Sequence, residues 1–270
     1  MKTWISIGLA AATLISTVPA RADDALKAAI AGAQRTPAFA SRDVWRHPYE
    51  TLSFFGLRAT DTVVELSPGG GWYSEILAPY LRERGRLILA GDDPASPQAY
   101  YQRSAVRLKQ KLEAQPAVYD KVQLSVFDAG AGKLAYAPAG AADLVLTFRN
   151  VHNWMSHGET RTQAVFQSAF DSLKPGGVFG VVEHRLPADR VQDEKAASGY
   201  VHQACVVRMA ERVGFKLAAS SEINANPRDT ADHEGGVWSL PPTFGLKDKD
   251  RARYEAIGES DRMTLKFVKP

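Results

Sequence analysis

Short apolar runs alternate along the chain with segments in which apolar residues recur at helical spacing. The runs are rich in β-branched residues and cover residues 62–66, 86–90, 122–126, 143–148 and 178–183. Two of the intervening segments carry one-sided apolar stripes, at Tyr101, Ala105, Leu108 and Leu112 and at Val165, Phe166, Ala169, Phe170 and Leu173. Strands that alternate with helices pair in parallel and are covered on both faces. The pattern therefore predicts an α/β protein with a mostly parallel sheet.

Capping signals set several of the expected boundaries. Residues 46–55 form a predicted helix that ends at Gly56, and Ser96-Pro97 is a predicted helix start. Beyond a helix near residues 201–213, strands are expected at 216–222 and 263–268, separated by a polar loop over 224–243. Two strands joined by such a long polar loop indicate an antiparallel edge of the sheet and a functional loop.

The first 22 residues have the pattern of a signal peptide. Lys2 gives a positive start, residues 5–18 are apolar but short for a membrane span, and Ala20 and Ala22 suit a signal peptidase. We expect cleavage after Ala22 and a periplasmic product; the alternative is an uncleaved anchor or a buried N-terminal helix. Residues 23–60 then form a helical lead-in to a single domain over 61–270.

Charge and composition restrict the partners. Removal of residues 1–22 takes away Lys2 and Arg21, so 33 basic residues become 31 against 30 acidic ones. Without a long Lys/Arg run, we expect neither nucleic-acid binding nor attraction to an anionic membrane surface. No second long apolar stretch predicts integral membrane association, and the partner expected is a small-molecule substrate.

A glycine-rich stretch follows the first predicted strand. Residues 67–71 read Ser-Pro-Gly-Gly-Gly, and Glu65 lies just before them. Glycines let a ligand approach the backbone, and ligands bind at the carboxyl ends of parallel strands; the alternative is a tight turn without a ligand. The stretch lacks the P-loop lysine and the G-x-G-x-x-G spacing. A carboxylate at Glu65 repels a pyrophosphate but anchors an ammonium group, which favours an amino-acid-bearing nucleoside.

These residues resemble those of a known superfamily. The pattern Glu65-x-Ser67-x-Gly69-x-Gly71 is similar to motif I of class I S-adenosylmethionine (SAM)-dependent methyltransferases, with Ser67 in place of the first glycine. Residues 143–146 resemble its fourth strand, and the L-K-P-G-G turn of 173–177 resembles the one before its fifth strand. Three segments resemble, more closely, a family of bacterial predicted methyltransferases that often carry signal peptides: residues 67–73, 148–154 and 258–262.

The resemblance implies a fold and a cofactor. The fold is Rossmann-like, a mostly parallel seven-stranded sheet with an antiparallel C-terminal strand and helices on both faces. The cofactor is SAM, held at Glu65, Ser67, Gly69 and Gly71. The family's ribose contact is an acid at the end of the second strand, where Gly91 is followed by Asp92 and Asp93. Asp128 matches the acid that contacts the adenine amino group, or it is a turn aspartate before Gly130.

Polar side chains also follow the fourth and fifth predicted strands. Arg149, Asn150 and His152 come after residues 143–148, and Glu183 and His184 end the next strand, so all should face the pocket. Either histidine is a candidate base if the acceptor must lose a proton, with a structural hydrogen bond as the alternative. Arg149 is a candidate for holding a carboxylate or phosphate of the acceptor, or for pairing with Glu183.

Aromatic residues complete the predicted pocket. Tyr73, Trp154 and Trp238 are candidates for its walls, where an aromatic face suits a sulfonium group, or they are ordinary packing residues. The six histidines lack H-x-x-H and H-E-x-x-H spacing, so we expect no metal site. No G-x-S-x-G elbow suggests a serine hydrolase.

Three functions fit this pattern. The leading hypothesis is a SAM-dependent methyltransferase acting on a small molecule or an envelope component. The alternative is an exported, non-catalytic nucleoside-binding or sensory protein that retains the fold, favoured by Ser67 in motif I and by the displaced acid after the second strand. A third is another reaction on the same scaffold with a different nucleoside.

Overall fold

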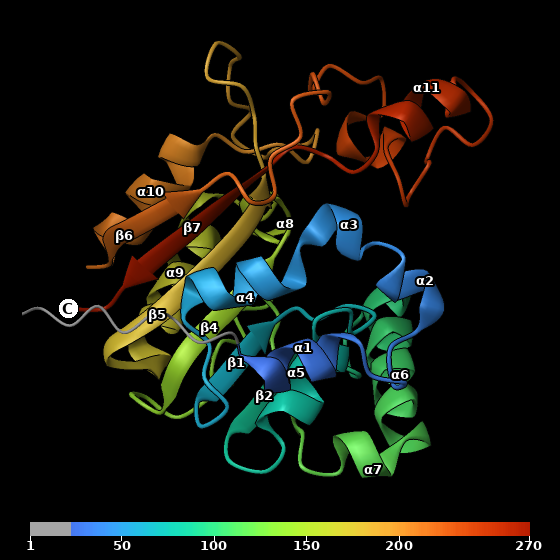
Figure 1. Ribbon diagram of the computed structural model, residues 1–270. Coiled ribbons are helices and arrows are strands. Elements are labelled where there is room, and N and C mark those ends of the chain that lie inside the picture. Colours follow the sequence, from blue (N-terminus) through green and yellow to red (C-terminus); the bar gives the residue numbers. More distant parts are fainter. Residues whose placement is uncertain (1–22) are drawn as a thin grey trace, which may run out of the picture.

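A seven-stranded sheet forms the centre of the computed structural model, which describes residues 23–270 (Figure 1). Its strand order is β3-β2-β1-β4-β5-β7-β6. The strands are β1 (Thr62–Leu66), β2 (Arg86–Gly91), β3 (Gln123–Val126), β4 (Ala142–Phe148), β5 (Leu173–His184), β6 (Lys216–Ser221) and β7 (Arg262–Val268). The first five pair in parallel, whereas β7 is antiparallel to both β5 and β6. The predicted Rossmann-like architecture is confirmed.

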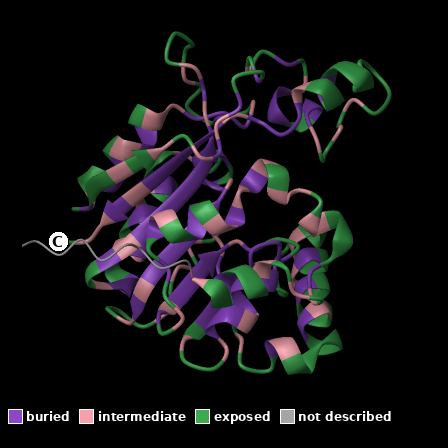
Figure 2. Cartoon of the chain, in the orientation of Figure 1, coloured by how far each residue is buried: buried purple, intermediate pink, exposed green. Residues whose placement is uncertain are grey.

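Helices cover both faces of the sheet. Apolar side chains of α1 (Asp24–Ile30), α4 (Pro48–Phe55), α5 (Ser74–Leu81), α6 (Ala99–Ala114) and α7 (Pro116–Tyr119) form one core cluster. Those of α8 (Val151–Met155), α9 (Glu159–Ser172) and α10 (Gln203–Arg212) form the other. The remaining helices are α2 (Pro37–Ala40), α3 (Asp43–Arg46), the 3-10 turn η1 (Gly236–Ser239) and α11 (Arg251–Ile257). Figure 2 shows the strands buried between helices whose outer sides are exposed.

The predicted helix over residues 46–55 is wrong in one respect. Helix α3 ends at Arg46, His47 takes a left-handed conformation with φ of 40°, and α4 begins at Pro48. Proline disfavours helical geometry in the residue before it and has no N–H to donate, so the chain breaks there. The expected stop is confirmed, because Gly56 has φ of 83° and the Leu57 N–H returns to the Leu52 carbonyl.

The predicted start of α6 is also wrong. The helix begins at Ala99 with Gln98 before it, and no side chain caps it. The Ser96 hydroxyl instead accepts the N–H of Gln98, two residues ahead, at 3.3 Å. Ser96 therefore closes a local turn that precedes the helix.

The polar excursion between β6 and β7 lies across the carboxyl ends of the parallel strands, near α3 (Figure 1). A buried carboxylate holds it in place: Asp229 accepts hydrogen bonds from the Tyr200 hydroxyl at 3.0 Å and the Asp261 N–H at 2.8 Å, and contacts His233 Nε2 at 2.8 Å. The excursion thereby places Trp238 and Glu259 over the rim where ligands bind in such sheets.

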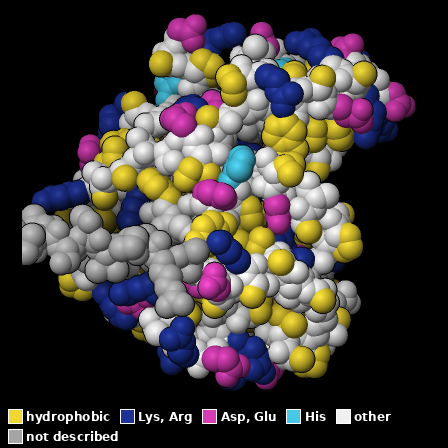
Figure 3. Space-filling model, viewed as in Figure 1, with side chains coloured by type: hydrophobic (Ala, Val, Ile, Leu, Met, Phe, Trp, Pro, Cys, Tyr) yellow, Lys and Arg dark blue, Asp and Glu magenta, His cyan; other side chains and the backbone are white. Residues whose placement is uncertain are grey.

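The predicted signal peptide and its cleavage site after Ala22 lie outside the described residues. Within residues 23–270, no helix combines the length and apolar composition needed to cross a membrane. On the face seen in Figure 3, basic and acidic side chains are interspersed.

Candidate functional site

A sharp bend of the backbone follows β1. Ser67, Gly69 and Gly71 all have positive φ, of 51°, 56° and 79°. Ser67 stands where motif I normally has its first glycine. The left-handed conformation at this position explains the preference for glycine, although serine adopts that conformation in this chain. A Cβ added at Gly69 would meet no atom within 4 Å, so bare backbone faces open space at this point.

The bend separates two cavities. The first, of about 180 Å³, lies beyond β1, β2 and β3 and is lined by Asp92, Asp128 and Trp154, among others. The second, of about 470 Å³, lies beyond β4 and β5, where it is lined by Arg149, His152 and His184 and closed by Glu259 and Trp238. Ser67, Gly69 and Asn150 line both cavities, so the two meet at the bend.

Asn150 fixes the bend from the neighbouring strand. Its amide nitrogen donates to the Leu66 carbonyl at 3.2 Å and to the Thr147 hydroxyl at 3.0 Å. The residue was predicted as part of the substrate pocket, and it does line it. Its amide group also ties the end of β4 to the end of β1.

Glu65 is a buried carboxyl group that lines the second cavity beside the bend. It is 2% exposed and accepts a hydrogen bond from the Ser74 hydroxyl at 2.7 Å. Burial raises its pKa to about 7, against the opposing effects of that hydrogen bond and of the Lys111 charge. A cation placed at this carboxyl group would be strongly favoured, as an ammonium group would be.

The two acids after β2 have different surroundings. Asp93 forms an ion pair with Lys133 and accepts the Ala95 N–H at 2.8 Å. Asp92 is half-buried in the first cavity, and burial raises the pKa of its carboxyl group against a hydrogen bond from Ser104. Of the two predicted ribose contacts, Asp92 is therefore the better placed.

Asp128 lines the same cavity and also closes a turn. Its carboxylate accepts the Ala131 N–H at 2.8 Å, and its backbone pairs with that of Lys133. The turn function considered for it is thus present, and its contact with an adenine amino group stays a prediction.

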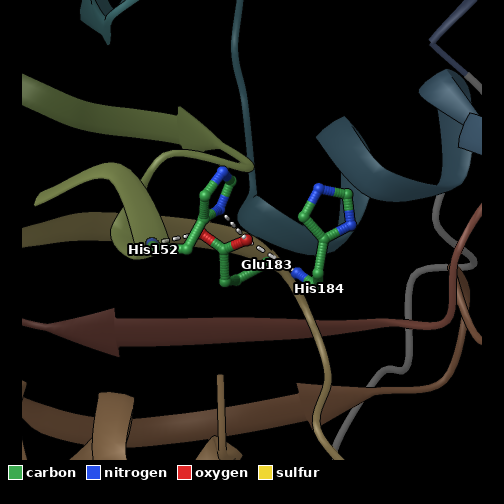
Figure 4. A group of neighbouring side chains, drawn as sticks. All are labelled: His152, Glu183 and His184. Atoms are coloured by element: carbon green, nitrogen blue, oxygen red, sulfur yellow. Dashed lines mark hydrogen bonds and ion pairs between the residues drawn. The ribbon is translucent and has the colours of Figure 1, made fainter. Parts of the chain in front are cut away.

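His152 and Glu183 form a hydrogen-bonded pair (Figure 4). The carboxylate accepts from His152 Nδ1 at 2.9 Å and from the backbone N–H groups of Val151, at 2.5 Å, and His184, at 2.8 Å. Because the carboxylate accepts at Nδ1, that nitrogen carries the proton and Nε2 keeps its lone pair. The histidine lines the second cavity, so its side chain is oriented as a general base would be.

His184 differs from its neighbour. Its Nδ1 lies 2.5 Å from the Ser260 hydroxyl, and burial lowers its pKa well below the ordinary value, with the charge of Arg149 acting in the same direction. Ligand atoms of His152, Glu183 and His184 lie within 4.8 Å of one another, a spacing that can hold a metal ion. Both Glu183 oxygens already accept N–H groups, however, so the carboxylate orients His152 rather than presenting open ligand positions.

The suggested pairing of Arg149 with Glu183 is wrong. Backbone N–H groups and His152 occupy the carboxylate instead. Within residues 23–270 no side-chain hydrogen bond acts on Arg149, which is partly exposed and lines the second cavity. Burial lowers its pKa to about 10.

The three predicted aromatic residues occupy different places. Trp154 lines the first cavity and packs edge-on against Phe127. Tyr73 lines the second and stacks on Phe148 with ring centroids 3.5 Å apart. Trp238 is 39% exposed at the mouth of the second cavity, edge-on to His152 at 5.9 Å.

The second cavity contains residues that the sequence pattern did not identify. Arg42 and Arg46 come from the segment around α3, and Glu259 and Ser260 from the turn before β7. The G-E-S-D-R of residues 258–262 had been noted only for its resemblance to a family. The i, i+4 spacing of Arg42 and Arg46 was another feature of the sequence that could have indicated that these residues belong to one site.

No protein-family model matches the chain, and no curated protein matches it in sequence. Solved structures resemble it in fold. A SAM-dependent methyltransferase from Aquifex aeolicus has a TM-score of 0.58 at 12% identity, over 87% of this chain and 95% of that one. The 4+2 cyclase SpnF has a TM-score of 0.58 at 15% identity, over 91% of each chain. The chain has the Rossmann-like methyltransferase fold.

A third structure with this fold is the glycopeptide N-methyltransferase MtfA complexed with sinefungin, with a TM-score of 0.50 at 16% identity over 83% of this chain and 93% of that one. At identities this low, structural similarity establishes the fold alone, and the reaction has to be argued from the residues of the site. SpnF, named as a cyclase, illustrates that one fold hosts several reactions.

The buried carboxyl group of Glu65 predicts a pH-dependent stability. Its pKa is raised from 4.5 to about 7, so between these pH values the folded state keeps a proton that the unfolded state releases. This residue therefore lowers the free energy of unfolding as pH rises from 4.5 to 7, by at most roughly 3 kcal/mol. Urea unfolding of wild type and Glu65→Gln across this range measures it. The difference between the two should grow with pH; parallel curves would contradict the burial assigned to this group.

Proposed function

We propose that this protein is a SAM-dependent methyltransferase acting on a small molecule or an envelope component. The observation that carries the proposal is the bare backbone bend between two cavities, where a donor on one side can meet an acceptor on the other. The fold it shares with proteins named as methyltransferases, one of them complexed with the SAM analogue sinefungin, supports it.

The residues of the first cavity and of the bend beside it fit an amino-acid-bearing nucleoside. Glu65 takes the ammonium group at the bend, and Gly69 leaves room for the amino-acid part beside its backbone. Asp92 accepts from the ribose hydroxyls and Asp128 from the adenine amino group, while Trp154 supplies an apolar wall. When bound, SAM supplies an activated methyl group on its sulfonium.

The residues of the second cavity fit an acceptor that must lose a proton. His152 Nε2 accepts that proton while Glu183 stabilises the resulting imidazolium through Nδ1. His184, held neutral by burial, remains a hydrogen-bonding group rather than a second cation. Much of the rate enhancement in a displacement of this kind comes from positioning two molecules in line.

Two departures from the methyltransferase pattern, Ser67 and the displaced acid after β2, favoured a non-catalytic binding protein. The observed backbone accommodates both. Ser67 takes the left-handed conformation that the motif needs, and Asp92 lies in the first cavity despite its offset. These two observations support nucleoside binding at the bend, and the His152–Glu183 pair beside it favours the enzyme over the alternative.

The proposal includes export of the protein. Residues 1–22 carry the pattern of a cleaved signal peptide, so the mature chain would begin at Asp23. Fractionation of producing cells, followed by N-terminal sequencing, should recover a periplasmic form that starts there. A cytosolic form that retains Met1 would contradict export.

Donor binding is tested with S-adenosylhomocysteine and residues 23–270. At about one hundred times its dissociation constant, the ligand should add about 2.7 kcal/mol to the free energy of unfolding. In Gly69→Ala a Cβ enters the cradle, and we expect at least about a tenfold weaker affinity. Gly140→Ala is the matched control, since Gly140 also has positive φ, of 63°, and open space around its Cβ position. Wild-type protein unaffected by millimolar ligand would overturn the proposal.

The base is tested by His152→Gln. Loss of proton transfer should reduce donor turnover, measured with radiolabelled SAM and periplasmic extract, by roughly 100-fold to 10,000-fold. Affinity for S-adenosylhomocysteine should change less than about twofold, because the residue contacts the acceptor. His202→Gln serves as control, because His202 lines neither cavity and its Nε2 contacts the Pro187 carbonyl. Turnover equal to that of wild type would remove His152 from the reaction.

A further inference from the structure

Four guanidinium groups gather around one carboxylate beside the second cavity. Arg42 and Arg46 approach from the segment around α3, Arg149 from the end of β4, and Arg262 from the start of β7. The carboxylate at their centre is Glu259, from the turn before β7. Three of the four arginines contact it directly.

These contacts use both oxygens of Glu259. Arg42 Nε donates to Oε1 at 2.6 Å, while Arg46 Nε, at 3.2 Å, and Arg262 Nη1, at 2.9 Å, donate to Oε2. Although burial opposes it, the positive charges lower the pKa of Glu259 to about 2. Glu259 therefore stays ionised and has little capacity for a further cation.

Buried guanidinium nitrogens of Arg42, Arg46 and Arg262 have no hydrogen-bond partner within residues 23–270. Arg46 is 2% exposed, and its Nη2 has no hydrogen-bond partner within residues 23–270. Arg149 is partly exposed, and no side-chain hydrogen bond acts on it in that part of the chain. Both line the second cavity, and burial lowers the pKa of each. A buried charged donor without a partner is costly, so the free Nη2 of Arg46 indicates that a ligand satisfies it, and Arg149 lines the same cavity.

The other nearby carboxyl groups, Glu65 in the cavity and Glu183 beside His152, have other partners. Glu65 is hydrogen-bonded to Ser74, and the cationic charge acting on its pKa is that of Lys111 rather than an arginine. Glu183 is occupied by His152 and backbone N–H groups. Around Glu259 itself, four guanidinium groups thus face a single carboxylate, and positive charge is in excess.

We infer that the methyl acceptor carries an anionic group, a carboxylate or a phosphate, which binds Arg149 and the free Nη2 of Arg46 in the second cavity. The planar guanidinium group suits both anions. The inference rests on the proposed function. The donor has a carboxylate of its own, but this would neutralise only one of the four guanidinium groups that surround Glu259.

Inorganic phosphate is the probe for this site. Residues 23–270 are titrated with phosphate at constant ionic strength, with and without saturating S-adenosylhomocysteine, and thermal unfolding is followed. We expect phosphate to raise the melting temperature further when S-adenosylhomocysteine is already bound. Arg149→Met should weaken phosphate binding at least about tenfold and change affinity for S-adenosylhomocysteine less than about twofold, and Arg149→Lys should recover part of the loss.

Phosphate also stabilises proteins by exclusion from their surface, so a control is needed. Arg58→Met provides it, because that guanidinium is exposed and lies before β1, at the opposite end of the sheet. An equal phosphate effect in the Arg149→Met and Arg58→Met variants would overturn the inference.

Two further outcomes are informative. Competition between phosphate and S-adenosylhomocysteine, with both weakened by Arg149→Met, would overturn the inference by showing that the arginines hold the donor's carboxylate. Phosphate binding that depends on Arg149 in a protein that does not bind S-adenosylhomocysteine would support the anion site and contradict the methyltransferase proposal instead.

Discussion

The left-handed turn of the backbone after β1 is the constraint on which the site depends. A strand that continued straight, or a bend carrying side chains, would fill the space where the two cavities meet. Ser67 and Gly69 take the required conformation, and the amide of Asn150 secures the turn from the next strand. The parallel sheet then brings the ends of four strands to the same edge, so residues from distant parts of the chain surround one stretch of bare backbone.

Electrostatics give the two sides of the bend opposite characters. Carboxyl groups are found on the nucleoside side, at Asp92, and beside the bend, where burial raises the pKa of Glu65 to about 7 and a bound cation would favour its ionised form. Guanidinium groups in excess of their one buried carboxylate are found on the other side. A site with this division suits a cationic ammonium group at one end and an anionic acceptor at the other, with the Glu183-oriented His152 between them.

The features that could be predicted well from the sequence are those that depend on local properties of the chain. Strand periodicity and the positions of glycine gave the architecture and placed Glu65 and His152 at the rim. The break at His47 was missed, although the following proline carried the signal. Glu259 and its arginines were missed because the contact from Arg46 spans 213 residues and arises only when the N-terminal segment meets the turn before β7. The Arg149 pairing failed because backbone N–H groups, which no sequence pattern displays, compete for Glu183.

A crystal structure of residues 23–270 with S-adenosylhomocysteine tests the central claim most directly. The account predicts the nucleoside in the first cavity, with its amino group at Glu65, its sulfur beside Gly69 and the second cavity open to an acceptor. A ligand bound elsewhere, or a bend closed by its own side chains, would contradict it.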